Sequence, residues 1–305
     1  MSRSFVAPTT IEEALTVLAR GARPVAGGTD LVVGARQGKA PLPDALLAIH
    51  RIQGLSGISD GPGGELRLGA LVTHLEIVAH PVVRERFTAL ADACAIVGSH
   101  ATRAQGTIGG NVMNASPAMD AGGPLLCFGG SVTLRSAGGE RVVPLAELWT
   151  GPGSTSAAPD ELLVAIALPA PVAGSGSCYV RLEYRRQMEI AVVGATAVVT
   201  LDGGVVSDAR VAITSLAPTI RRVPQAEHEL VGSDGATPTI EAAARATANA
   251  SAPIGDVRGS AGYRQAMAQV IARRAITGAI ARANGEDVAI PASSSLFGDG
   301  AGGTR

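Results

Sequence analysis

Two glycine-rich segments carry the residue types that best suit the binding of a nucleotide. The first runs from Ala26 to Asp30 and ends a predicted strand, and the second runs from Gly106 to Asn111. Consecutive glycines let the backbone approach a ligand closely and direct its N–H groups toward an anion. Neither segment contains lysine, so amide dipoles rather than a counter-charge would hold a diphosphate.

The neighbours of these glycines strengthen that interpretation. A single Gly-Gly pair in a chain with 39 glycines is most simply a turn, because glycine is the default turn residue. Here both segments contain a threonine, and Asp30 and Asn111 stand beside the glycines. Asp30 and Asp120 are acceptors suited to ribose or ribityl hydroxyls or to a ring N–H. The residues therefore favour a nucleotide site without identifying the nucleotide.

Rival motifs are missing from the sequence or stand in the wrong context. A literal G-x-G-x-x-G at Gly298, Gly300 and Gly303 has no predicted strand before it, which excludes a Rossmann loop. The sequence contains no P-loop motif and no G-x-S-x-G nucleophile elbow. His74 and His80 flank a helical segment with no third ligand nearby, which predicts surface or capping roles. We expect no catalytic acid–base pair and no metal site on this chain.

Composition narrows the class of protein further. The formal net charge of −1 shows no excess of basic residues of the kind that binds nucleic acid or an anionic membrane. No apolar run has the length of a transmembrane helix, and none near the N-terminus resembles a signal peptide, so we expect a cytoplasmic protein. Cys94, Cys127 and Cys178 are scattered, which predicts buried thiols and excludes a four-cysteine iron–sulfur cluster on this chain.

The pattern of helices and strands predicts an α+β fold with two domains. Thr9 and Thr10 with Glu12 and Glu13 form two overlapping capping boxes at the start of a first helix. Residues 74–98 have a helical pattern that restarts at Pro81, and residues 98–123 are predicted as a loop. Further strands are expected at residues 23–28, 46–52, 65–73, 131–136 and 161–169.

The C-terminal part of the sequence differs in composition and in its pattern of predicted strands. Residues 170–177 are rich in Gly, Ser and Pro and predict a linker. An antiparallel meander over residues 178–217 and two helices over 239–250 and 260–283 follow it. The second helix is expected to pack on the sheet through Tyr263, Met267, Val270, Ile271 and Ala275. We place the domains at residues 1–175 and 176–285 and expect residues 286–305 to be a disordered tail.

Four stretches resemble a known family. They are RPVAGGTDLVVGARQG, GSHATRAQGTIGGNVMNASPAMD, RRQMEIAVVGATAVV and GDVRGSAGYRQAMAQVIARRAI. In this order they are similar to the signature stretches of the FAD-binding medium subunit of xanthine dehydrogenase-type molybdenum hydroxylases. Aerobic carbon monoxide dehydrogenase has a related subunit. The resemblance extends from Phe5 to about Ala283. It implies a PCMH-type domain of two α+β lobes that grip FAD, followed by a small antiparallel sheet with helices.

The resemblance also implies which residues bind FAD. The two glycine segments would hold the diphosphate and the adjoining ribityl and ribose. Asp120 matches the acidic position that contacts FAD in the family, and Arg181 stands where a basic residue often approaches the flavin. Ile190 stands where a side chain covers a face of the flavin ring, and Leu163 matches a strand position that contacts the flavin. The complete set is Ala26, Gly27, Gly28, Thr29, Asp30, Leu31, Thr107, Ile108, Gly109, Gly110, Asn111, Asp120, Leu163, Arg181 and Ile190. Ala104 and Gln105 depart from the family, which often has Asn or Arg before T-I-G-G-N.

The same resemblance implies partners and an electron-transfer role. A small subunit would carry [2Fe–2S] clusters and a large subunit the molybdopterin cofactor, in a heterotrimer or a dimer of heterotrimers. Electrons would reach FAD here and leave for NAD⁺, a quinone or oxygen. Two alternatives stay open at this point, a stand-alone flavoprotein oxidase or dehydrogenase of the same broad fold and a non-enzymatic nucleotide-binding protein. No motif supplies the acid–base pair that a stand-alone oxidase needs.

Overall fold

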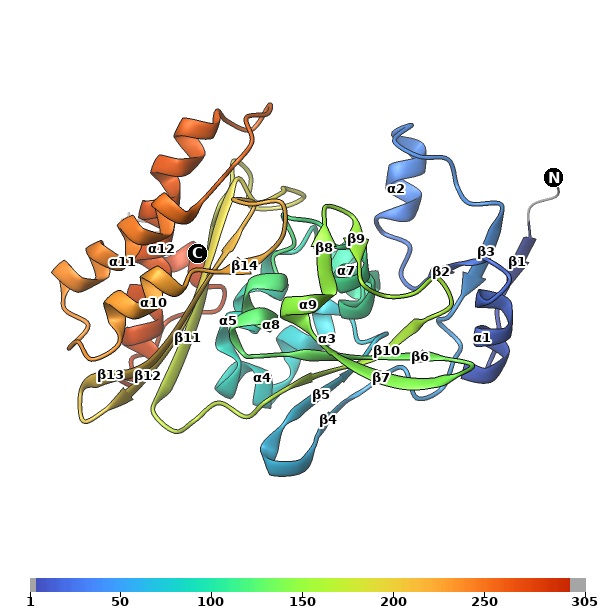
Figure 1. Cartoon of the computed structure of the whole chain (residues 1–305), viewed down its shortest axis with the longest axis horizontal. Coiled ribbons are helices and arrows are strands. Elements are labelled where there is room, and N and C mark those ends of the chain that lie inside the picture. The colour runs from blue at the N-terminus through green and yellow to red at the C-terminus, as the bar shows by residue number, and fades with distance from the viewer. Residues whose placement is uncertain (1–3, 297–305) are drawn as a thin grey trace. The chain divides into compact units, whose positions relative to one another are not determined.

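A computed structural model describes residues 4–296 of the chain (Figure 1). The chain divides into two compact units, and each unit is assembled from separate stretches of sequence. Unit 1 comprises Met1–Glu76, His100–Ala115 and Gly129–Pro169, and unit 2 comprises Ile77–Ser99, Ser116–Phe128 and Ala170–Arg305. Beyond the first sheet, helices and strands follow one another without a regular βαβ alternation, which confirms the predicted α+β class. The units do not follow the sequence-based division at residue 175, because two early segments lie in unit 2.

The N-terminal part of unit 1 is a three-stranded parallel sheet with a helix packed on it. The strand order is β1 (Ser4–Val6), β3 (Ala45–Ala48) and β2 (Arg23–Val25). Helix α1 (Ile11–Leu18) buries its apolar side in a core that includes Leu47 of β3. The Thr10 hydroxyl accepts a hydrogen bond from the Glu13 N–H, as the second of the two predicted capping boxes requires. Helix α2 (Leu31–Arg36) begins directly after the first glycine segment.

The rest of unit 1 is built on a five-stranded antiparallel sheet. Its order is β4 (Ile58–Asp60), β5 (Leu66–Gly69), β10 (Leu162–Leu168), β6 (Ser131–Ser136) and β7 (Gly139–Pro144). Leu162 and Val164 of β10 join the core around α1. Since side chains alternate along a strand, Leu163 faces the opposite side. The remaining elements are η1 (Pro62–Gly64), α9 (Leu145–Leu148), β8 (Trp149–Gly151) and β9 (Ser154–Thr155).

The prediction of a loop over residues 98–123 is wrong. Three short helices occupy most of it: α6 (His100–Gln105) and α7 (Ile108–Asn114) in unit 1, and α8 (Gly122–Cys127) in unit 2. Glycine weakens helix propensity, but tertiary packing overrides propensity where space is tight. A Cβ atom at Gly109 would lie 2.5 Å from the Ala70 carbonyl oxygen, so only glycine allows α7 to pack there.

Unit 2 is a four-stranded antiparallel sheet with helices on both faces. The order β11 (Ser175–Leu182), β12 (Val193–Asp202), β13 (Val205–Thr214) and β14 (Arg221–Arg222) confirms the predicted meander. One face packs against α10 (Pro224–Leu230) and α12 (Ala261–Ala283), and α11 (Thr237–Ala250) packs on these two helices (Figure 1). The other face packs against α5 (Thr88–Ile96) and α8. Strand β11 begins at Ser175, so the predicted linker ends earlier than expected.

Two expectations about the helices of unit 2 need adjustment. The 74–98 segment forms three helices, α3 (His74–Ala79), α4 (Pro81–Arg86) and α5, with the predicted restart at Pro81. On α12, Ile271 and Ala275 are buried as predicted, whereas Tyr263 is 40% exposed. Half of the buried residues of α12 are alanines, which permit a close approach of the helix to the sheet.

The prediction of a disordered tail from residue 286 is wrong for residues 286–296. Helix α13 (Ala292–Leu296) lies in unit 2, and Ala292 and Ser293 are buried. Arg282 donates hydrogen bonds to the carbonyls of Val288 and Ala289, and Asp92 accepts one from the Ala292 N–H. These bonds hold a segment whose small polar composition alone indicated disorder. Residues 297–305, with the G-x-G-x-x-G run, lie outside the described residues.

Candidate functional site

The two glycine segments lie directly against each other in unit 1, although they are far apart in the sequence. A Cβ atom at Gly27 would overlap the carbonyl oxygen of Gln105, which immediately precedes the second segment. A Cβ atom at Gly106 would lie 3.5 Å from the Thr29 hydroxyl oxygen. At the other end, a Cβ atom at Gly110 would lie 4.0 Å from the Ala26 Cβ. The two segments therefore form one continuous backbone surface.

The glycines of this surface have two different roles. Gly27 and Gly109 are required by the fold, because carbonyl oxygens of Gln105 and Ala70 occupy the space of a side chain. Gly28 has a φ of +69°, a conformation that favours glycine. Gly110, in contrast, is exposed, and a Cβ atom there would meet only the Thr107 hydroxyl at 3.0 Å and Ala26. The absence of a side chain at Gly110 leaves the surface open to a ligand.

Polar groups beside the glycines complete the candidate site. The Thr107 hydroxyl caps α7 by accepting a hydrogen bond from the Gly110 N–H at 3.1 Å. Asn111 Oδ1 is buried and has no hydrogen-bond partner in the described part of the chain. A buried acceptor left unpaired costs about 1–3 kcal/mol. Asp30 is exposed, and Leu31 is half-buried at the start of α2. The unpaired Asn111 Oδ1 acceptor beside the open glycine surface fits a ligand that carries hydroxyl or N–H donors.

His74 lies beneath the junction of the two segments, a role that was not predicted from the sequence. Its side chain is 2% exposed, and its Cδ2 atom is 3.4 Å from the position of a Cβ atom at Gly106. Burial, reinforced by the nearby Arg103 guanidinium, lowers the pKa of His74 to about 4. Glu76 caps this helix instead, by accepting hydrogen bonds from the N–H and hydroxyl of Thr73. The expected surface or capping role of His74 is therefore wrong, because a sequence pattern does not reveal burial.

The other candidate residues are divided between the units. Leu163 is buried on β10 in unit 1, beside a register shift in the pairing of β10 with β6. Asp120, Arg181 and Ile190 belong to unit 2. Ile190 is 45% exposed and lies in the connection between β11 and β12. Thus the glycine segments and Leu163 belong to one unit, and the remaining three candidates belong to the other.

Asp120 and Arg181 form a buried ion pair within unit 2. Arg181 Nη1 donates to Asp120 Oδ2 at 2.8 Å, and the Tyr179 hydroxyl donates to Asp120 Oδ1 at 2.6 Å. Arg181 Nε also donates to Glu183. Burial and the adjacent Asp120 carboxylate raise the pKa of Tyr179 well above its usual value, so its hydroxyl stays a donor. Tyr179 and Glu183 were not among the predicted site residues.

Other kinds of site find little support. Within residues 4–296, no group of three His, Cys, Asp or Glu side chains is arranged to hold a metal ion. All three cysteines are free and buried, as predicted, and burial raises the pKa of each thiol. None of the described helices combines the length and the apolar character needed to span a membrane.

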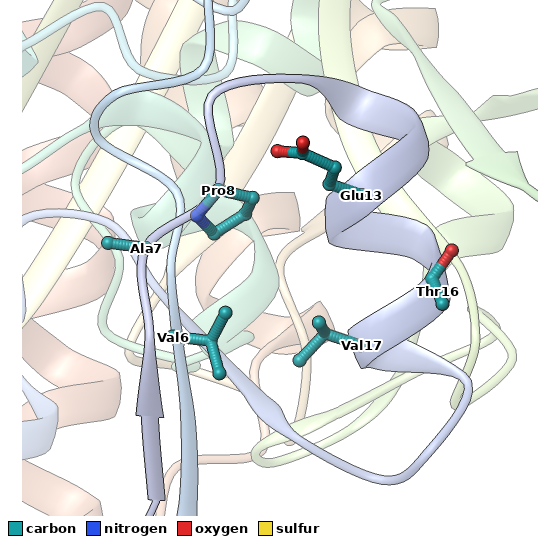
Figure 2. A pocket seen from close by; sticks show the side chains of 6 residues that line it. All are labelled: Val6, Ala7, Pro8, Glu13, Thr16 and Val17. Atoms are coloured by element: carbon teal, nitrogen blue, oxygen red, sulfur yellow. The ribbon is translucent and has the colours of Figure 1, made fainter.

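A pocket of unit 1 lies between the end of β1 and α1 and is separate from the glycine surface. Figure 2 shows the side chains that line it, from Val6, Ala7, Pro8, Glu13, Thr16 and Val17. Glu13 accepts a hydrogen bond from the Thr9 N–H at the start of α1. None of the lining residues belongs to either glycine segment, and we assign no ligand to this pocket.

Comparisons with known sequences identify the family. Residues 1–171 match the model of the FAD binding domain in molybdopterin dehydrogenase, and residues 179–279 match the CO dehydrogenase flavoprotein C-terminal domain. The chain is 32% identical to the carbon monoxide dehydrogenase medium chain of Afipia carboxidovorans, over 88% of this chain and 92% of that protein. It is 29% identical to the putative xanthine dehydrogenase FAD-binding subunit of Escherichia coli K12, over 93% of this chain and 98% of that protein.

Solved structures agree with this relationship. A chain of the Cu,Mo-CO dehydrogenase matches with a TM-score of 0.88 and 30% identity, over 92% of this chain and 99% of that chain. A chain of quinoline 2-oxidoreductase from Pseudomonas putida 86 matches with a TM-score of 0.86 and 27% identity, over 93% of this chain and 98% of that chain. The glycine surface with its unpaired Asn111 acceptor thus occurs in a fold shared with flavoprotein subunits. The chain belongs to the FAD-binding medium subunits of the molybdenum hydroxylase family, and it is an oxidoreductase subunit.

Proposed function

We propose that this chain passes electrons from [2Fe–2S] clusters of a partner subunit, through its own FAD, to a terminal acceptor. The observation that supports this role is the continuous glycine surface, open at Gly110 and flanked by the unpaired Asn111 acceptor. The relatives named as medium or FAD-binding subunits support the same role. NAD⁺, a quinone and oxygen are all compatible acceptors.

The two glycine segments would hold the diphosphate of FAD and the adjoining ribityl and ribose groups. The segments from Ala26 to Leu31 and from Thr107 to Asn111 contain no lysine or arginine. Backbone N–H groups of the first segment would therefore supply donors toward the phosphates, because the N–H groups of Ile108 to Asn111 already donate within unit 1. Asn111 Oδ1 would accept a hydrogen bond from a hydroxyl of the cofactor, which satisfies an otherwise unpaired buried atom.

The remaining candidates would act around the flavin. Leu163 and Ile190 supply apolar surface, and Asp120 supplies an acceptor beside it. Bound FAD accepts electrons singly and releases them as a pair, and the protein contributes binding, orientation and electrostatic tuning. No side chain of this subunit is required as a general acid or base toward the hydroxylated substrate.

The proposed partners would carry the iron–sulfur clusters and the molybdopterin cofactor. The three cysteines of this chain are free and buried with raised pKa values, so they do not offer thiolates to a cluster. We propose a small iron–sulfur subunit and a large molybdopterin subunit, in a heterotrimer or a dimer of heterotrimers. The large subunit would select and hydroxylate the substrate. We also retain residues 1–175 and 176–285 as the proposed domains.

Anaerobic mixing of the purified chain with aldehydes and heterocycles, followed by flavin absorbance, tests this proposal. We expect the isolated chain to bind FAD and to remain oxidised with every substrate. Addition of the small and large subunits is expected to restore substrate-dependent bleaching. If the isolated chain, free of molybdenum and iron, were bleached by a substrate, it would be a stand-alone oxidase or dehydrogenase instead. A chain that binds no FAD would contradict both readings.

A further inference from the structure

Three polar side chains, those of Tyr179, Arg181 and Glu183, alternate along the end of strand β11 and the residue after it. Cys178 and Val180 belong to the apolar core of unit 2, so the alternating residues Tyr179 and Arg181 face α5 and α8. Glu183 continues the same alternation just after the strand ends. Tyr179 and Arg181 converge on the Asp120 carboxylate, which comes from the segment before α8, and Glu183 binds Arg181.

Each oxygen of the Asp120 carboxylate has its own donor. Oδ1 accepts the Tyr179 hydroxyl at 2.6 Å, and Oδ2 accepts Arg181 Nη1 at 2.8 Å. Hydrogen bonds that involve a charged partner are the stronger class in proteins. Glu183 binds Arg181 Nε and so fixes the guanidinium from its other edge. A carboxylate has about four lone-pair sites, so these two bonds orient it without exhausting its capacity to accept.

The backbone of β11 holds the two donors in place. The Tyr179 N–H donates to Asp92 at 3.1 Å, and the Arg181 N–H donates to the Ser293 hydroxyl at 3.0 Å. Gly194 on the neighbouring strand makes room for the phenol, because a Cβ atom there would lie 2.7 Å from the Tyr179 hydroxyl. The position of the hydroxyl therefore depends on packing as well as on its own hydrogen bond.

The exposure of the side chains decides which group can reach a ligand. The Arg181 side chain is 0% exposed, whereas the side chains of Asp120 and Glu183 are 9% and 16% exposed. Tyr179 is also 0% exposed. A ligand can therefore touch the carboxylates but not the two donors behind Asp120.

We infer that Tyr179, Arg181 and Glu183 are positioning residues, which orient the Asp120 carboxylate for its contact with the flavin cofactor. This inference rests on the proposed function, in which Asp120 touches FAD. It changes the expected role of Arg181, which acts on the cofactor through Asp120. It also adds Tyr179 and Glu183 to the residues that matter for FAD.

The test compares three variants of the full chain with the wild type: Tyr179→Phe, Asp120→Asn and the double variant. Tyr263→Phe is the matched control, because it removes a hydroxyl from a partly exposed position on α12. The measurements are the Kd for FAD by flavin fluorescence, the midpoint potential of the bound flavin and the Tm of the FAD-free protein. The Tm verifies that each variant folds.

We expect Tyr179→Phe to raise the Kd for FAD by about tenfold, the effect of one charge-assisted hydrogen bond. In the Asp120→Asn background the same change should add less than about twofold, because coupled residues are not additive. The midpoint potential of the bound flavin should shift in opposite directions in the Tyr179→Phe and Asp120→Asn variants. Loss of the donor concentrates negative charge on Asp120 and lowers the potential, whereas Asp120→Asn removes that charge and raises it.

Three results would overturn the inference, and they can be told apart. If Tyr179→Phe matches Tyr263→Phe while Asp120→Asn weakens binding, the positioning role fails but the Asp120 contact stands. If Asp120→Asn leaves both the Kd and the potential unchanged, the contact fails and the positioning role with it. If the effects of the two substitutions simply add, Tyr179 acts independently of Asp120.

Discussion

The glycine surface of unit 1 and the Asp120 cluster of unit 2 present different kinds of groups to a ligand. The first consists of backbone atoms with no lysine or arginine, and its geometry depends on the absence of side chains. The second consists of side chains whose charges are paired at 2.8 Å in a buried setting. The first is therefore sensitive to added volume, and the second to the loss of one charge. This difference separates the changes that remove FAD from those that unfold a unit.

The largest effect on stability is expected from Arg181→Met. It leaves the buried Asp120 and the half-buried Glu183 without their common partner, and breaking a buried ion pair costs about 3–5 kcal/mol. Urea unfolding of the FAD-free protein measures this cost. Arg185→Met is the matched control, because the Arg185 side chain is 67% exposed, so water screens its pair with Glu189. It should change stability by less than about 1 kcal/mol. Equal losses for the two variants would contradict the structural importance of the buried pair.

Gly110→Val is expected to abolish FAD retention while the chain stays folded. A branched side chain would occupy the open side of the glycine surface, whereas its only near neighbours are the Thr107 hydroxyl and Ala26. FAD content after purification and the Tm measure the two properties separately. Gly27→Val is the informative contrast, because its side chain would overlap the Gln105 carbonyl and lower the Tm as well. A Gly110→Val protein that remains fully yellow would remove the second segment from the site.

Asp120→Ala should weaken FAD binding without releasing the cofactor entirely. One charge-assisted hydrogen bond contributes about 1.5–3 kcal/mol, against many contacts along an extended dinucleotide. The Kd for FAD should therefore rise by about ten- to a hundredfold, and the midpoint potential should shift. Arg181 remains paired with Glu183 in this variant, so the fold should tolerate the change better than Arg181→Met. Unchanged affinity together with an unchanged potential would make Asp120 a purely structural residue.

The smallest expected effect concerns pH and His74. The pKa of His74 is lowered to about 4 in the folded chain, against about 6.5 when unfolded, so the unfolded state binds the proton more readily. Stability from the neutral imidazole is complete above about pH 6.5 and declines as the pH falls toward about 4. Between about pH 7.5 and pH 5 this loss amounts to about 2 kcal/mol. Urea unfolding of His74→Gln should lack this part of the pH dependence. An identical profile for both proteins would contradict the buried neutral state.

Different parts of the molecule were predictable from the sequence to different degrees. The meander of unit 2 was predictable because β-branched runs joined by short turns specify neighbouring strands locally. The contact between Gly27 and Gln105 is tertiary, and no local pattern indicates it. The helices at residues 100–114 were missed because glycine and asparagine resemble a loop. Tyr179, Arg181 and Glu183 did carry a signal, since they alternate with the apolar residues Cys178, Val180 and Leu182 in a predicted strand.

The discontinuous construction of unit 2 affects how the chain folds during synthesis. Asp92 on α5 binds Arg282 on α12, a partner 190 residues later in the sequence. At a synthesis rate of about 5–20 residues per second, Asp92 is made about 10–40 seconds before the arginine that neutralises it. For nearly half of this time α5 also lacks the strand β11 against which it packs, because β11 begins only at Ser175. The Asp92 carboxylate must therefore stay in contact with water, or with a chaperone, until α12 has left the ribosome.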